Sequence, residues 1–350
     1  MRRGSERVIH DLAAYLAGRG FEPTVLTGHR GRPRTSQEDG FEVVRTWRPP
    51  ARLQPRGLEP YANHAPLALA GVARRRFDLL HVFHVPDAAA AGLWASLRRI
   101  PLVLSLMGFP DRQSLGAFRG RARLLRFAVA RASAVHVLSE AAGGALENAA
   151  AIRAIVIPPG TRTEAFRVPV QRTEAPVIFC AASARDPRKR VAELVEAFKV
   201  LRRTRPEARL LITGPVPERN RDRFEAPGVD EMSAWLDQNE LVRTYASSWL
   251  TVLPSGREVF GQVLVESLAA GTPVVAVRDG ATPEIVDDAR VGVLCGGADP
   301  ESLAAGLRRG LELAEMEGTA GACREHAARW DWSRIGPRFE ALYEQVLGRE

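Results

Sequence analysis

Short apolar runs alternate with amphipathic stretches along most of the chain. Apolar runs bounded by turn residues predict buried strands, whereas apolar residues recurring every three or four positions predict helices. The predicted strands cover residues 23–27, 41–47, 78–83, 102–106, 134–138, 154–157, 177–180, 210–213, 250–253 and 292–294. One more strand is predicted directly after Gly271. One predicted helix starts at Ser5, and the others cover 62–76, 87–99, 191–203, 230–236, 241–247, 262–270, 300–313 and 335–347. Because strands and helices alternate, we expect an α/β fold with mostly parallel sheets covered on both faces.

Polar residues and Pro169 interrupt this alternation between Gly160 and Thr173, which predicts a linker. At 350 residues the chain is long enough for two domains of ordinary size. We therefore expect a first doubly wound, Rossmann-like domain over residues 1–165 and a second over residues 166–331. A terminal amphipathic helix is expected over residues 332–350.

Composition narrows the range of functions. Apolar residues make up 45% of the chain and charged residues 26%, as in soluble globular proteins. The first residues include Glu6 and Asp11 and so do not resemble a signal peptide. Cys180, Cys295 and Cys323 are far apart and form no C-x-x-C pair, which argues against disulfides and zinc. We therefore expect a cytoplasmic protein without a metal or cofactor.

The formal net charge of +8 comes almost entirely from arginine and favours acidic ligands such as nucleotide diphosphates. The basic residues are dispersed, and no nucleic-acid-binding motif is present, so nucleic acid is not an expected partner. Neither G-x-x-x-x-G-K-[ST] nor a G-x-G-x-x-G after a strand occurs, which argues against kinases and most dehydrogenases.

Residues 253–277, LPSGREVFGQVLVESLAAGTPVVAV, carry the most specific chemistry. A helix entered through Phe260-Gly261 directs several backbone N–H groups outward, and these groups form a site for phosphate oxygens. Glu266 lies about one turn (~5.4 Å) inside that helix, where a carboxylate can bind both hydroxyls of a ribose. Glu258, before the turn, can hold sugar hydroxyls and offset the positive charge of an oxocarbenium-like transition state. Alternatively, both acids are solvated on a surface helix.

The pattern E-x-F-G-x-x-x-x-E, followed by S-L-A-A-G-T-P-V-V-A, resembles the donor-binding signature of retaining glycosyltransferase family 4. This resemblance implies the GT-B fold, with two Rossmann-like domains and a C-terminal helix that crosses back to the first. It places Glu258 at the donor sugar and Glu266 on the ribose. It is strong from Val177 to Leu313 and weaker before, and Val259 stands where the family mostly has a small residue. The donor diphosphate would be bound by the backbone amides of Phe260, Gly261, Gln262 and Val263.

The loop that contains Asp186-Pro187-Arg188-Lys189 is the second candidate donor contact, because cations there can bind a diphosphate. The family has an arginine and a lysine six positions apart in this loop. Lys189 matches the lysine, but Ser183 stands at the arginine position. Arg185 or Arg188 could supply the missing charge. Alternatively, this is a solvated basic loop.

The acceptor side is expected in the first domain. Met107 stands where many family members end a strand with a histidine, and methionine neither takes up a proton nor donates a hydrogen bond. His81 and His84 are candidates for acceptor contact, although a histidine at a strand end is more often structural. Gly4 lies in Arg3-Gly4-Ser5-Glu6, which resembles the family's Gly-rich first loop, yet only two residues precede it. We therefore expect the first strand to be absent because the sequence is clipped, which would leave two strands of the core unpaired.

The segment Phe118 to Arg131 alternates basic and apolar residues at helical spacing, which suggests peripheral membrane contact. Alternatively, it is a helix packed on the sheet with its arginines in water.

Taken with the resemblance, these features predict a retaining, metal-independent hexosyltransferase with a nucleotide-diphosphate sugar as donor. Metal-dependent glycosyltransferases of the other main fold resemble one another in an Asp-x-Asp triplet, which this chain lacks. Two alternatives are a catalytically silent nucleotide-sugar-binding protein, suggested by Met107 and Ser183, and a nucleotide-sugar epimerase. The sequence leaves open the donor base and sugar, the acceptor, the linkage and the oligomeric state.

Overall fold

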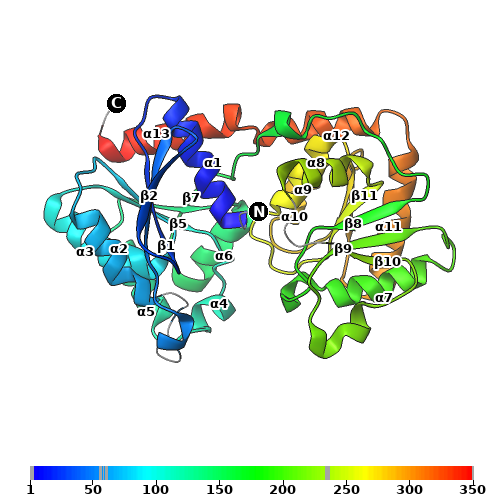
Figure 1. Ribbon diagram of the computed structural model, residues 1–350, viewed down its shortest axis with the longest axis horizontal. Coiled ribbons are helices and arrows are strands. Elements are labelled where there is room, and N and C mark those ends of the chain that lie inside the picture. Colours follow the sequence, from blue (N-terminus) through cyan, green and yellow to red (C-terminus); the bar gives the residue numbers. More distant parts are fainter. Residues whose placement is uncertain (1–3, 55–56, 58, 60–61, 233–236, 349–350) are drawn as a thin grey trace. The chain divides into compact units, whose positions relative to one another are not determined.

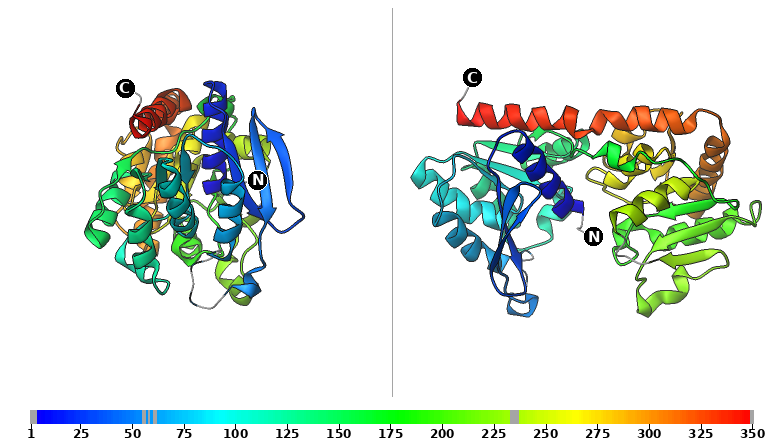
Figure 2. Two further views of the ribbon diagram at one scale, coloured as in Figure 1. Left: turned by 90° about the vertical axis from the view of Figure 1, so that its left-hand side faces the viewer. Right: turned by 45° about the horizontal axis from the view of Figure 1, so that its top comes forward.

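The computed structural model describes residues 4–54, 57, 59, 62–232 and 237–348. The chain forms two compact units (Figure 1). The N-terminal unit comprises Arg2–Gly160 and Ser333–Glu350, and the C-terminal unit comprises Thr161–Trp332. Each unit is an α/β assembly of strands and helices (Figure 2). Each has its own hydrophobic core.

The N-terminal unit contains two sheets, whereas the sequence predicted one. Parallel pairing dominates as predicted, with β2 antiparallel to β3. The strand orders are β1-β3-β2 and β4-β5-β6-β7, so β1 and β4 are edge strands. The strands are β1 (Thr24–His29), β2 (Arg34–Glu38), β3 (Phe41–Trp47), β4 (Leu80–Val82), β5 (Leu102–Leu106), β6 (Ala134–Val137) and β7 (Ile155–Val156). The helices are α1 (Gly4–Gly18), η1 (Ala51–Leu53), η2 (Ala62–His64), α2 (Ala65–Ala73), α3 (Val85–Arg98), α4 (Arg112–Gly116), α5 (Arg121–Val129) and α6 (Glu140–Ala150).

The last helix, α13 (Trp332–Leu347), continues in the N-terminal unit. Its Glu340 side chain accepts hydrogen bonds from Tyr15 and Arg19 of α1. Its Tyr343 bonds to His81 of β4. The terminal helix thus packs in the same unit as the first half of the chain, as the resemblance implies.

The C-terminal unit is built on one parallel sheet in the order β10-β9-β8-β11-β12-β13. Its central strands are buried apolar runs, as a sheet covered on both faces requires. The strands are β8 (Val177–Cys180), β9 (Arg209–Thr213), β10 (Val229–Met232), β11 (Leu250–Leu253), β12 (Val274–Val277) and β13 (Gly292–Cys295). The helices are η3 (Thr163–Phe166), η4 (Pro187–Lys189), α7 (Val191–Leu201), η5 (Glu218–Phe224), α8 (Gln238–Ser247), α9 (Gln262–Ala270), α10 (Thr282–Ile285), α11 (Pro300–Glu315), α12 (Thr319–Ala327) and η6 (Ala328–Trp330).

One predicted element of this unit is wrong. The helix expected over residues 230–236 is strand β10 as far as Met232, and residues 233–236 lie outside the described part. β10 pairs in parallel with β9 at the edge of the sheet. All three cysteines are buried free thiols.

Candidate active site

The loops that could hold a ligand in the C-terminal unit meet where the winding of its sheet reverses. From β8 the chain moves outward to β9 and β10, then returns to add β11 on the other side of β8. In open parallel sheets, ligands bind beyond the carboxyl ends of the strands at such a switch point. The loops after β8 and β11 flank this point, and the loop after β12 lies next to them.

An ion pair joins the first two of these loops. Lys189 Nζ, from the loop after β8, lies 2.6 Å from Glu258 Oε2, from the loop after β11. Both side chains are only partly accessible, with 23% of Lys189 and 12% of Glu258 exposed. The sequence singled out both residues for separate roles at a donor, and the structure brings them together.

The backbone around Glu258 is held by contacts that only glycine permits. Gly280 has a φ of +63°, and a Cβ built on it would lie 2.3 Å from the Glu258 carbonyl oxygen. The amide of Ala281 donates to that same oxygen at 2.9 Å. In the adjoining loop, the Gly256 amide donates to the carbonyl of Arg188 at 2.8 Å. Backbone contacts therefore join the three loops and fix the position of the Glu258 backbone.

The loop enters helix α9 as predicted, through a glycine in the left-handed region. Gly261 has a φ of +96°, and Phe260 beside it is buried edge-on against Trp330, with ring centroids 6.3 Å apart. The first amides of a helix have no acceptor in a preceding turn, so those of Gln262 and Val263 are suited to bind an anion. The side chain of Gln262 donates to Thr161 Oγ1 at 2.8 Å.

Glu266 lies one turn into α9 and is 1% exposed. Its Oε2 accepts a hydrogen bond from the buried Tyr245 hydroxyl at 3.1 Å. In the loop after β8, Ser183 is exposed, and Arg188 pairs with Asp186 of its own turn at 2.6 Å. The predicted ribose role of Glu266 and the phosphate roles of Ser183 and Arg188 stay predictions.

Sequence reasoning missed Arg190 and Asp279. Arg190 Nη2 lies 3.6 Å from Asp279 Oδ2, and a Cβ on Gly256 would approach the same nitrogen to 2.6 Å. Arg190 also precedes the first residue of α7 and has a φ of +48°. It therefore supplies a second cation next to the loop after β11. Its place directly after Lys189, at the start of a predicted helix, was the signal that could have found it.

In the N-terminal unit, His84 belongs to a polar cluster at the start of α3. Its Nδ1 lies 3.2 Å from Asp87 Oδ2, and His64 Nδ1 lies 3.8 Å from Asp87 Oδ1. Burial opposes ionisation of Asp87, but hydrogen bonds from His64 and His84 outweigh it, so the pKa of Asp87 is lowered. Gly4 begins α1, and Met107 directly follows β5 with its side chain half-buried.

His81 belongs instead to a largely buried hydrogen-bonded chain across the four-stranded sheet. Its Nδ1 lies 2.7 Å from Tyr343 Oη, and its Nε2 lies 2.6 Å from Ser105 Oγ. Ser105 Oγ also lies 2.5 Å from His136 Nδ1, and His136 Nε2 lies 2.7 Å from the Ile157 carbonyl oxygen. Both ring nitrogens of His81 are thus engaged by protein groups, which favours the structural role for this histidine.

The direction of every hydrogen bond in this network can be assigned by starting from the Ile157 carbonyl at its end. A carbonyl only accepts, so His136 carries its proton on Nε2 and accepts at Nδ1 from the Ser105 hydroxyl. Ser105 then accepts from His81 Nε2–H, and His81 Nδ1 accepts from the Tyr343 hydroxyl. Burial lowers the pKa of His136 to about 4, and burial with the nearby His136 lowers the pKa of His81 well below its usual range. Both lowered pKa values favour the neutral imidazoles, for which these directions of donation hold.

Comparison with known proteins agrees with this architecture. Residues 162–329 match the family model described as "Glycosyl transferases group 1", and residues 3–160 match the "Glycosyl transferase 4-like domain". The chain is 31% identical over 295 residues to the MMP alpha-(1->4)-mannosyltransferase of Mycolicibacterium hassiacum, covering 80% of this chain and 68% of that enzyme. It is 42% identical over 116 residues to the D-inositol 3-phosphate glycosyltransferase of Thermobispora bispora, which is 32% of this chain and 26% of that enzyme.

Among solved structures, sucrose-phosphate synthase from Thermosynechococcus elongatus superposes with a TM-score of 0.83 at 20% identity. The superposition covers 99% of this chain and 94% of that one. Two Rossmann-like units with a terminal helix joining the first define the GT-B class. The chain belongs to glycosyltransferase family 4 and is a glycosyltransferase that uses a nucleotide sugar.

Two absences among the described residues bear on the site and its surroundings. No helix among them combines the length and apolar content needed to cross a membrane. Within the same ranges, no group of three or more His, Cys, Asp or Glu residues is arranged to hold a metal ion.

Proposed function

We propose that the chain is a retaining hexosyltransferase that acts on a nucleotide-diphosphate sugar without a metal ion. The observation that carries this proposal is the Lys189–Glu258 pair, 2.6 Å apart, at the switch point beside the start of α9. It offers a cation for the leaving diphosphate and a carboxylate for the sugar from adjoining loops.

In the proposed reaction, the bond between the anomeric carbon and the diphosphate oxygen breaks, and negative charge develops on that oxygen. Lys189 and the amides of residues 260–263 stabilise this charge, which is the work a metal ion does in other transferases. The acceptor hydroxyl attacks from the same face, and its proton passes to the departing phosphate oxygen. Glu258 offsets the positive charge on the sugar.

The existing ion pair implies an exchange on donor binding. Lys189 cannot bind Glu258 and a diphosphate oxygen through the same N–H groups, so the donor competes with Glu258 for Lys189. Once Lys189 turns to the diphosphate, the Glu258 carboxylate can accept hydrogen bonds from sugar hydroxyls. Arg190 is a further candidate for the diphosphate. Glu266 is proposed to bind the ribose. If the Tyr245 hydroxyl orients the Glu266 carboxylate, Tyr245→Phe should weaken nucleotide binding.

We place the acceptor on the N-terminal unit, near Gly4, His84 and Met107. Asp87 supports this, because a carboxylate of lowered pKa beside His84 fixes the orientation of that imidazole. One acceptor chemistry that such a site suits is a polyol, since carboxylate and imidazole groups bind hydroxyls well. The relatives named above, a mannosyltransferase and an inositol-phosphate glycosyltransferase, agree with this class.

The donor site can be tested without an acceptor. Thermal unfolding with UDP, GDP, TDP or ADP at about 100 times the dissociation constant should gain ~2.7 kcal/mol for the bound nucleotide. Glu266→Ala should abolish the shift. With the matching nucleotide sugar, slow hydrolysis should first release the anomer that has the donor's configuration, as observed by NMR. First release of the opposite anomer would contradict a retaining mechanism.

A further inference from the structure

Helix α3 exposes two large apolar side chains to solvent. Leu93 is 52% exposed, and Leu97, one turn later, is 78% exposed, the highest value among the exposed large apolar side chains of the described residues. Ala88 and Ala95 of the same helix are almost fully buried. The two leucines therefore form the outer stripe of a helix whose other face packs on β4 and β5. Exposed apolar side chains mark an interaction site where they gather with others on one face.

Helix α5, which packs beside α3 (Figure 1), adds an aromatic ring and basic groups to this face. Phe127 is 39% exposed, and the Arg131 guanidinium lies 3.6 Å from its ring centroid. A Cβ on Gly92 of α3 would lie 3.3 Å from Arg131 Cβ, so this arginine sits directly against α3. Leu125 and Ala128 of α5 are buried, and the helix packs against α3 and α4.

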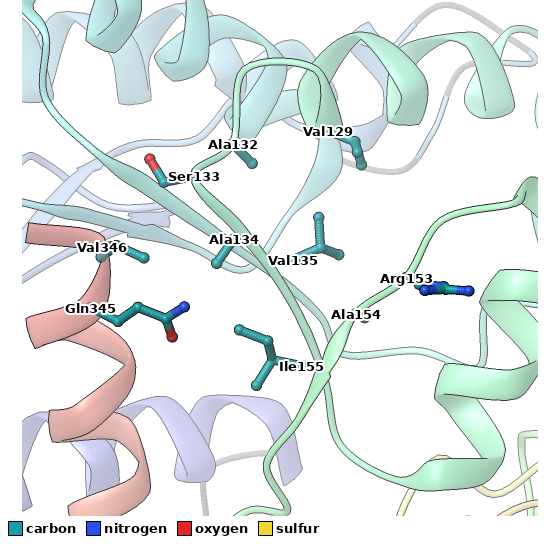
Figure 3. A pocket seen from close by; sticks show the side chains of 10 residues that line it. All are labelled: Val129, Ala132, Ser133, Ala134, Val135, Arg153, Ala154, Ile155, Gln345 and Val346. Atoms are coloured by element: carbon teal, nitrogen blue, oxygen red, sulfur yellow. The ribbon is translucent and has the colours of Figure 1, made fainter. Parts of the chain in front are cut away.

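Two open grooves run along the ends of these helices. The larger, about 560 Å³, is lined by Arg99, Arg131, Ser96, Ser133 and Asp78, with Val346 and Leu347 of α13. The second, about 380 Å³, adjoins it at Ser133 and Val346 (Figure 3). Arg99 and Arg131 provide guanidinium donors that match a phosphate group, beside the Asp78 carboxylate on the same groove.

Arginines in the described residues fall into two groups, those with a carboxylate partner and those without one. Arg290 pairs with Asp288, and Arg221 pairs with Glu231. By contrast, the part of the chain that the structure describes supplies no carboxylate partner within ion-pair distance to Arg98, Arg99, Arg123, Arg126 or Arg131. Arginines without carboxylate partners attract negative charge, and the exposed leucines favour an apolar layer. This face is therefore complementary to a surface whose outer layer is negatively charged and whose inner layer is apolar.

We propose that this face of the N-terminal unit docks on an anionic lipid surface. Leu93, Leu97 and Phe127 enter the boundary between headgroups and acyl chains, and the arginines around them bind lipid phosphates. The groove between Arg99 and Arg131 takes one such phosphate. The enzyme would then work on a membrane surface without spanning it, whichever sugar it transfers.

Flotation of the full chain with phospholipid vesicles tests this proposal. The protein should float with vesicles of phosphatidylcholine containing about one-third phosphatidylglycerol and should not float with phosphatidylcholine alone. Arg98→Glu/Arg99→Glu should lower the partition coefficient at least about tenfold. Leu97→Ser should lower it several-fold, and raised salt should release the wild-type protein.

Matched variants separate this face from general charge and general hydrophobicity. Arg308→Glu/Arg309→Glu reverses another adjacent, exposed arginine pair, on α11. Met316→Ser removes an exposed apolar side chain at the end of the same helix. Both should float like the wild type. The proposal is overturned if the wild type does not float with anionic vesicles, or if the control pair loses binding equally. Dimerisation in solution that Leu97→Ser abolishes would also overturn it, because a second copy would then cover this face.

Discussion

The histidine network of the N-terminal unit and the Lys189–Glu258 pair of the C-terminal unit differ in how far protein groups satisfy them and how far solvent reaches them. In the chain from Tyr343 to His136, protein groups satisfy every link, and Ser105, His136 and Tyr343 are buried. The lowered pKa values of His81 and His136 favour neutral imidazoles. At the switch point of the C-terminal unit, Lys189 and Glu258 are charged groups on adjoining loops, partly open to solvent. The difference indicates what each is for. A closed polar network stabilises one arrangement, whereas an open ion pair can exchange a protein partner for a ligand.

The largest effect should come from Glu258. Glu258→Gln keeps the size of the side chain but removes the charge that we assign to the sugar. We expect kcat to fall about 10²- to 10³-fold, the cost typical of losing one electrostatic contact in the transition state. Nucleotide diphosphate binding should hold or tighten, because Lys189 no longer has an internal partner. Turnover and calorimetric titration measure the two effects.

The control for that experiment is Glu193→Gln, an exposed carboxylate that pairs with Arg223 at 3.8 Å. It should leave kcat within about twofold of the wild type, since surface substitutions away from a site change little. If Glu258→Gln weakened nucleotide binding while sparing turnover, the division of roles proposed here would be reversed.

The histidine chain should respond to acid. The pKa of His136 is about 4 in the folded protein, below the usual value of 6.5, so the unfolded state binds more protons between these values. The stabilisation is therefore fully present above pH 6.5 and is lost as pH falls toward 4. The loss should be on the order of 3 kcal/mol for this group. Urea unfolding from pH 7 downward measures it, and His136→Gln should flatten the profile.

Removing the first donor of that chain should have a smaller effect. Tyr343→Phe leaves His81 Nδ1 buried without its donor, which should cost about 1 to 3 kcal/mol of unfolding free energy. Tyr15→Phe is the matched control, because Tyr15 also bonds across to α13, at Glu340, from a half-buried position. It should cost less than Tyr343→Phe, because Glu340 keeps its hydrogen bond from Arg19 and is not left unsatisfied. Equal losses of unfolding free energy in the two variants would show that the histidine network contributes no more stability than the Tyr15–Glu340 hydrogen bond.

Removal of metal ions should have no effect. If Lys189 and the start of α9 supply all the positive charge at the leaving group, the rate of donor cleavage should be the same with EDTA as with Mg²⁺. A rate that falls with EDTA and returns with Mg²⁺ would show that the diphosphate also needs a cation from solution.

Much of the fold could be predicted, because burial leaves a pattern along the chain. Strands β3, β5, β8 and β11 and helix α9 occupy the predicted ranges, since each is an apolar run or has a helical period. Strand β2 was missed because Arg34–Glu38 is polar and mostly exposed. Strand β10 was mistaken for a helix because Asp230 and Glu231 interrupt the strand pattern at a sheet edge.

The site could be predicted only one residue at a time. Motif spacing singled out Lys189 and Glu258, but they are 69 positions apart, and only the strand order brings them within 2.6 Å. The hydrogen-bonded histidine network could not be predicted from the sequence for the same reason. His81, Ser105, His136 and Tyr343 lie on three strands and a distant helix, and no local pattern relates them.

Gly280 imposes a constraint that reaches beyond its own loop. It has no side chain to contribute and need touch no substrate, yet the backbone of Glu258 lies where its Cβ would be. Any larger residue there must push the neighbouring loop aside, so Gly280→Ala should behave in a screen like damage to the sugar contact itself. A library of variants designed to change substrate specificity should therefore keep Gly280. It should vary neighbouring side chains instead, whose backbone positions the joined loops fix.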